Sequence, residues 1–169
     1  PIVPAVEKAV KFAASKGIVM VCAAGNSGDG DPTTNEMKAY PARWKETISV
    51  AAVRKSIGLP VATFSESNPE VDFAGIGLEV TSLKPGGGYQ QMSGTSMASP
   101  HVAGLIAALM SNGGYKNNPK KVQKDLASKF TVDIAAEGKD NSTGLGFATF
   151  LSKAEFKAKV SRGSTARAY

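Results

Sequence analysis

The stretch that most constrains this 169-residue chain runs from Gly94 to Gly104 and has the pattern of a strand-to-helix junction. A short strand is predicted just before it, and Gly94 allows a tight turn. From Met97 onward, apolar residues recur at helical spacing and predict a helix that ends near Asn112. Ser96 is therefore expected at or just before the helix start.

A serine at a helix start has two interpretations. Its hydroxyl commonly accepts a hydrogen bond from a free backbone N–H and acts as an N-cap. It is also suited to nucleophilic attack, because the free N–H groups at a helix N-terminus favour the negative charge that acyl transfer generates. For an arbitrary serine the capping role is the commoner one, so the surrounding motif has to decide.

The eleven residues Gly-Thr-Ser-Met-Ala-Ser-Pro-His-Val-Ala-Gly at 94–104 resemble the nucleophile segment of the subtilisin-like serine proteases, the subtilases. The resemblance implies that Ser96 attacks the scissile carbonyl and that its backbone N–H is one oxyanion donor. Gly94 and Thr95 would then contact the substrate. It also implies the α/β fold of that family, a parallel sheet with helices on both faces.

Residues 18–24 form a continuous apolar run after a predicted helix over 4–16, and predict a central parallel strand covered on both faces. The loop that follows lies at the carboxyl end of this strand, where ligands gather in α/β sheets. On its own, the Gly-Asn pair at Gly25 and Asn26 indicates a turn with a left-handed Asn.

In context, the sequence Ala-Ala-Gly-Asn at 23–26 resembles the subtilase segment that carries the oxyanion-hole asparagine. The resemblance implies that the side-chain amide of Asn26 is the second oxyanion donor. It also implies that this segment lines one side of the pocket for the side chain before the scissile bond, through Ala23, Ala24, Gly25 and Ser27. Ser27 is neutral, so this side offers no charge to select a basic residue.

Further elements follow in order along the chain. Strands are expected at 47–53 and 61–64, a hairpin at 79–83 and 89–92, and helices at 119–130 and 152–160. Ile76 stands where the family usually has Pro. We expect residues 1–160 to be the C-terminal half of a subtilisin-like peptidase domain and 161–169 to be a basic tail.

Metal and modification signals are weak. Asp29 and Asp31 lack the spacing of a calcium loop, so a solvated loop is expected, and Ca²⁺ is implied only by the family resemblance. The single cysteine, Cys22, is expected to pack as a small hydrophobe. The Tyr40–Pro41 bond is predicted trans by default. Asn141 begins an N-glycosylation triplet.

The chain has one histidine, His101, five residues after Ser96. Five helical residues turn by about 500° and rise about 7.5 Å, so the two side chains point apart and His101 is given a packing role. The family's catalytic Asp and His lie in Asp-[Ser/Thr]-Gly and His-Gly-Thr stretches, and neither occurs here. We therefore expect an N-terminal subtilase fragment or chain, carrying that Asp and His, as partner.

The predicted function is a serine endopeptidase fragment that cleaves polypeptide substrates once this partner completes it. The alternative is a non-catalytic structural or regulatory subunit that retains the subtilase fold. Net charge is +6, but no aromatic residues are interleaved with the basic ones, so nucleic-acid binding is not expected. No apolar run approaches the ~18 residues of a membrane span. The family resemblance implies a secreted or lumenal location.

Overall fold

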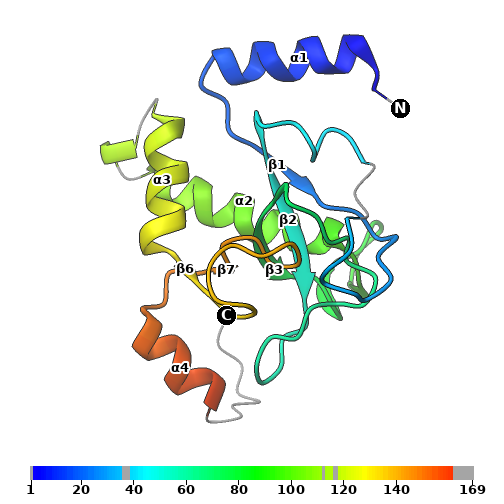
Figure 1. Ribbon diagram of the computed structural model, residues 1–169, viewed down its shortest axis with the longest axis vertical. Coiled ribbons are helices and arrows are strands. Elements are labelled where there is room, and N and C mark those ends of the chain that lie inside the picture. The colour runs from blue at the N-terminus through cyan, green and yellow to red at the C-terminus, as the bar shows by residue number, and fades with distance from the viewer. Residues whose placement is uncertain (1, 36–38, 112, 116–117, 162–169) are drawn as a thin grey trace.

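The computed structural model describes residues 2–35, 39–111, 113–115 and 118–161 (Figure 1). The helices are α1 (Pro4–Ser15), α2 (Thr95–Ser111), the 3₁₀ turn η1 (Gly113–Tyr115), α3 (Pro119–Lys129) and α4 (Lys153–Ser161). The strands are β1 (Met20–Ala23), β2 (Thr47–Val53), β3 (Val71–Ile76), β4 (Val80–Leu83), β5 (Tyr89–Met92), β6 (Thr131–Val132) and β7 (Phe147–Ala148). Nearly all of the expected basic tail, residues 162–169, lies outside the described part.

The described strands form a five-stranded sheet in the order β1-β2-β3-β7-β6. Strands β1, β2, β3 and β7 run parallel, and β6 is antiparallel to β7. All seven residues of β2 are buried, as expected for a central parallel strand. This architecture confirms the predicted α/β fold with a mainly parallel sheet.

One face of the sheet is covered by α2, which lies behind the strands in Figure 1. Ile48, Val50 and Ala52 alternate along β2 and point to this face, where they pack with Val102 and Ile106 of α2. The helix approaches closely because β3 carries Gly75, where an added Cβ would lie 2.6 Å from the carbonyl oxygen of Ala98. The sheet therefore fixes the position of the helix that begins beside Ser96.

The opposite face is covered by the C-terminal part of the chain. Val53 and Ala74 pack there with Val132, Phe147 and Phe156, the last from α4. The rings of Phe147 and Phe156 lie 5.8 Å apart between centroids. Helices thus lie on both faces, as the family resemblance implied.

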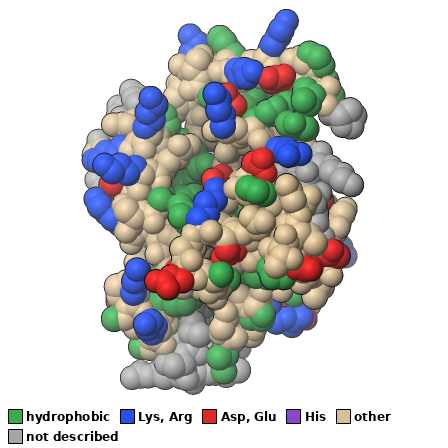
Figure 2. Space-filling view, in the orientation of Figure 1, with side chains coloured by type: hydrophobic (Ala, Val, Ile, Leu, Met, Phe, Trp, Pro, Cys, Tyr) green, Lys and Arg blue, Asp and Glu red, His purple; other side chains and the backbone are tan. Residues whose placement is uncertain are grey.

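The prediction that residues 18–24 form a central strand is wrong for the described part of the chain. Strand β1 is the edge of the sheet, paired only with β2, and all four of its residues are half-buried. Figure 1 shows α1 standing away from the sheet beyond this edge, and hydrophobic side chains are exposed over that region in Figure 2. Val10 is the one residue of α1 that is buried, whereas Phe12 is 64% exposed.

Three further expectations met different outcomes. The hairpin is confirmed, with β4 and β5 antiparallel and Leu83 opposite Tyr89. Residues 61–64 are not a strand, because Val61 makes a single bridge to Val53 and a turn then joins Ala62 to Ser65. The Tyr40–Pro41 bond is cis, so the trans expectation is wrong.

Among the described residues, no helix is long and apolar enough to cross a membrane.

We expect Gly75→Ala to lower the free energy of unfolding by about 1–3 kcal/mol, because the new methyl group would press on the main chain of α2. Gly104→Ala is the matched control, since it lies in α2 with nothing within 4 Å of an added Cβ and should be neutral or stabilising. Urea denaturation of the purified protein measures both. Equal stability of the two variants would contradict the close packing of α2 on β3.

Candidate active site

The loop after β1 and the first turn of α2 are joined by hydrogen bonds between Asn26 and Thr95. The Oδ1 atom of Asn26 accepts from the Thr95 backbone N–H at 2.8 Å and from the Thr95 hydroxyl at 2.9 Å. The same hydroxyl accepts from the Gly25 N–H at 3.2 Å. Two residues almost seventy positions apart in sequence therefore share one corner of the molecule, beside Ser96.

These bonds fix which way the amide of Asn26 points. A backbone N–H can only donate, so the atom that faces Thr95 must be the carbonyl oxygen of the amide. The amide nitrogen, Nδ2, is consequently directed away from Thr95 and stays free to donate. It lies on the Gly94 side, 3.4 Å from where a Cβ of that residue would stand.

A second donor is provided by the start of α2. The first N–H groups of a helix have no partner within the helix. The Thr95 N–H is taken by Asn26, and the Met97 and Ala98 N–H groups bond to the carbonyl oxygen of Gly94. Within the described residues, the N–H of Ser96 is left available, and the Ser96 side chain is exposed. The N–H nitrogen of Ser96 and Nδ2 of Asn26 lie 3.7 and 3.4 Å from the same point, the position that a Cβ on Gly94 would take.

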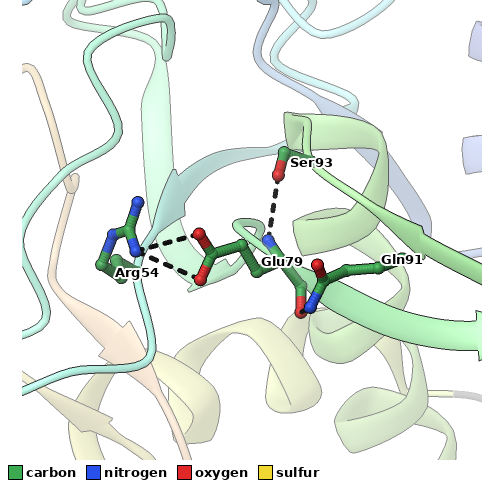
Figure 3. A network of polar contacts seen from close by, with 4 residues as sticks. All are labelled: Arg54, Glu79, Gln91 and Ser93. Atoms are coloured by element: carbon green, nitrogen blue, oxygen red, sulfur yellow. Dashed lines mark hydrogen bonds and ion pairs between the residues drawn. The ribbon is translucent and has the colours of Figure 1, made fainter.

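Hydrogen bonds to the residue after β3 and contacts around the hairpin hold the segment just before Ser96 in place. The Gly94 N–H donates to the carbonyl oxygen of Gly77 at 2.7 Å. Figure 3 shows the adjoining contacts around Glu79, whose N–H donates to the Ser93 hydroxyl at 2.9 Å and whose carboxylate pairs with Arg54 at 3.1 Å. Gln91 also donates to the main chain of Glu79. This ion pair is exposed and contributes at most about 1 kcal/mol, so the backbone bonds hold the segment.

No base for Ser96 is present in the described part of the chain. His101 is exposed and its Nδ1 lies 2.8 Å from the carbonyl oxygen of Met97, one turn earlier in α2. The expected packing role of His101 is therefore not seen within this chain. Burial raises the pKa of the Cys22 thiol, against a smaller opposite effect of its hydrogen bond to Thr47, so Cys22 is a neutral thiol at pH 7 and no rival nucleophile.

The residues predicted to line the substrate pocket separate into two groups. Asn26 and Ser27 are exposed and Ala23 and Gly25 are half-buried, so they can border a pocket. Ala24, Gly94 and Thr95 are buried. Ala24 packs against Ala51 and Val71, and the Thr95 side chain is used entirely in holding Gly25 and Asn26. Their side chains thus support the site from behind.

The sequence analysis missed one residue at this site, Glu66. Glu66 is 94% buried, and its carboxyl group lies against Gly25. Gly25 has a φ of +129° and no side chain, and an added Cβ there would overlap the carboxyl group. No motif marks Glu66, because the contact joins two loops that are distant in sequence.

The described residues hold no group of three or more acidic, Cys or His side chains that could bind a metal ion. The side chain of Asp31 bonds the N–H and hydroxyl of Thr33, and that of Asp29 bonds the Asp31 N–H. This loop is exposed, as expected for a solvated turn.

Comparison with known proteins identifies the family of this chain. The family model described as the subtilase family, Peptidase S8, matches residues 1–146. The major intracellular serine protease of Bacillus subtilis (strain 168) is 43% identical over 109 residues, which cover 64% of this chain and 33% of that protein. Subtilisin E of the same organism is 42% identical over 107 residues, covering 63% of this chain and 27% of that protein.

Solved structures give the same answer for the fold. The S41 psychrophilic protease superposes with a TM-score of 0.78 at 31% identity, covering 89% of this chain and 54% of that one. Sphericase also gives a TM-score of 0.78, at 30% identity and with the same coverage. The chain therefore belongs to the subtilase family of serine proteases. It spans about a third of the length of the first curated relatives it matches.

We expect Thr95→Val to lower kcat for peptide hydrolysis by the complete protein about tenfold, the equivalent of one lost hydrogen bond of about 1.4 kcal/mol. The substitution leaves the Gly25 N–H without its acceptor and removes one of the two hydrogen bonds that orient the amide of Asn26, while the bond from the Thr95 N–H remains. Thr95→Ser keeps the hydroxyl and should stay close to the wild type. Equal rates for the Val and Ser variants would show that the hydroxyl does not position Asn26.

Proposed function

We propose that this chain carries the nucleophile and the oxyanion hole of a serine endopeptidase. The observation that supports this most directly is the pair of free donors beside Ser96, namely its own N–H and Nδ2 of Asn26. Ser96 Oγ attacks the scissile carbonyl carbon, and the carbonyl oxygen takes up the electron pair and receives both hydrogen bonds. An acyl-enzyme forms on Ser96, and water later hydrolyses it.

The proton of Ser96 needs an acceptor from outside this chain. His101 is the only histidine, and it is engaged on its own helix. We infer that an N-terminal part of the protease, in the same polypeptide or another, provides a His to take the proton and return it to the leaving amine. An Asp from that part holds the His in its working tautomer.

The free edge of the sheet supports this inference and indicates where the N-terminal part docks. Within the described part of the chain, strand β1 has one unpaired side, although its residues are apolar and half-buried. Beyond it, α1 exposes Phe12 and Val6, at 64% and 43%. An exposed parallel edge with apolar flanks is unfavourable in water, and a further parallel strand would cover it. The same docking would bring the missing wall of the substrate cleft against the loop that holds Asn26.

The relatives also bear on the cellular compartment. Two of them are named as intracellular serine proteases. Those names weigh against the secreted or lumenal location that the resemblance implied, and we propose a protease that acts inside the cell. Polypeptides are the substrate class in either compartment.

A fluorophosphonate probe tests the nucleophile. In the complete protein we expect stoichiometric labelling at Ser96, because the assembled base and oxyanion hole activate the hydroxyl. Ser96→Ala is the control for labelling elsewhere and should remove the signal. Absence of labelling in a folded, complete protein would favour the alternative, a structural or regulatory subunit without turnover.

Replacement of Asn26 tests the oxyanion hole separately. We expect Asn26→Leu to lower kcat about 10²–10³-fold with little change in KM, because the amide acts on charge that develops only in the transition state; subtilisin itself exemplifies this magnitude. Gln123→Leu, which changes an exposed amide of α3 in the same way, should leave kcat unchanged. A rise in KM alone for Asn26→Leu would assign the residue to substrate binding instead.

A further inference from the structure

The carboxyl group of Glu66 lies directly against the loop of the proposed oxyanion hole. The Glu66 side chain is 94% buried, and its backbone N–H donates to the carbonyl oxygen of Gly25 at 3.1 Å. Any Cβ on Gly25 would overlap the carboxyl atoms. The acidic group thus occupies the space that a side chain at residue 25 would fill, in the segment proposed to line the pocket for the residue before the scissile bond.

Among the residues that the structure describes, this carboxyl group has no cationic partner. Its Oε2 atom is buried with no hydrogen-bond partner, and no Lys, Arg or His of the described residues forms an ion pair with Glu66. Burying a carboxylate without a cation or hydrogen bonds to offset its lost hydration costs free energy. Buried polar atoms without a hydrogen-bond partner are rare in folded proteins. An incoming positive charge at short range would offset that cost.

The position also opposes the reaction of uncharged substrates. Asn26 directly follows Gly25, so Glu66 places an acidic group against the loop that holds the proposed oxyanion donor. Two negative charges repel each other, and the repulsion grows as their separation and the local dielectric constant fall. Glu66 therefore disfavours hydrolysis of a substrate with a neutral side chain before the scissile bond. It favours a substrate with a cationic side chain there, because that charge would screen the carboxylate.

We propose that Glu66 is a specificity-determining residue that favours Lys or Arg immediately before the scissile bond. This inference rests on the proposed peptidase function and names its substrate class. The neutral Ser27 offered no charge to select a basic residue. Here the charge comes from Glu66, in the loop after β2, whose carboxyl group occupies the space left by the absence of a side chain at Gly25. Basic and neutral substrates should therefore respond in opposite directions when the charge is removed.

The test compares two peptide amides that differ only in Arg or Leu before the scissile bond, with the complete protein as enzyme. We expect the wild type to prefer Arg. In Glu66→Gln, the ratio of kcat/KM for Arg over Leu should fall about tenfold or more, the effect of one charge at several ångströms, while kcat/KM for Leu is unchanged or higher. Glu70→Gln is the matched control, because Glu70 lies near Arg43 and away from Gly25, and should keep the wild-type ratio.

Each other outcome decides the matter differently. An unchanged ratio in Glu66→Gln, with both substrates still cleaved, overturns the role of Glu66 and leaves the peptidase proposal standing. Failure of the complete wild-type protein to cleave either peptide removes the proposed function and this inference with it. If Glu66→Gln does not fold, the ratio of kcat/KM for Arg over Leu in the wild type tests the proposal. A wild type that prefers Leu overturns it, and one that prefers Arg supports it.

Discussion

The hydrogen bond from the Thr95 N–H to Oδ1 of Asn26 is the contact on which the site depends. It satisfies one of the free donors at the start of α2 with a side chain from a distant loop, as a capping residue would do locally. In doing so it orients the amide, so that Nδ2 turns toward the position beside Ser96. One bond therefore joins the helix that carries the proposed nucleophile to the loop that carries the proposed second donor.

The parallel sheet makes that bond attainable. Strand β1 pairs in register with β2, with Val21 opposite Ile48, and the Ala24 N–H extends the pairing to the carbonyl oxygen of Val50. The loop at Asn26 thus leaves the sheet at its carboxyl end. Packing of α2 on the same strands, with the close approach at Gly75, brings the helix start to that edge. Catalytic geometry here follows from strand register and helix packing together.

Local signals in the sequence predicted much of this arrangement. The pair Asn118 and Pro119 has the composition of a helix start, an N-cap followed by Pro at the first helical position, and favours the expected helix over 119–130. The Asn118 side chain accepts from the Lys121 N–H in the structure. The hairpin was predicted from alternating residues around a Gly-rich turn, and it is present. Both depend on residues near in sequence, where the periodicity of side chains and the chemistry of turns act directly.

The rest depends on contacts between distant segments. Residues 61–64 have the composition of a strand, yet tertiary context gives them only one bridge. The apolar composition of β1 also predicted a central strand, whereas β1 lies at an edge of the described sheet. Composition indicates which environment a strand prefers, but it does not indicate whether a neighbouring strand is present. The contact of Glu66 with Gly25 has no local signature at all. Such features become visible only when the loops are placed in space.

The most direct test of the oxyanion hole is a crystal structure of the complete protein with a peptide phosphonate bound covalently to Ser96. The phosphonyl oxygen stands in for the oxyanion of the tetrahedral intermediate. We expect this oxygen to lie about 2.7–3.1 Å from both the Ser96 N–H nitrogen and Nδ2 of Asn26, with Oδ1 of Asn26 still bonded to Thr95. A phosphonyl oxygen directed away from Asn26, or an amide turned so that Nδ2 faces Thr95, would contradict it.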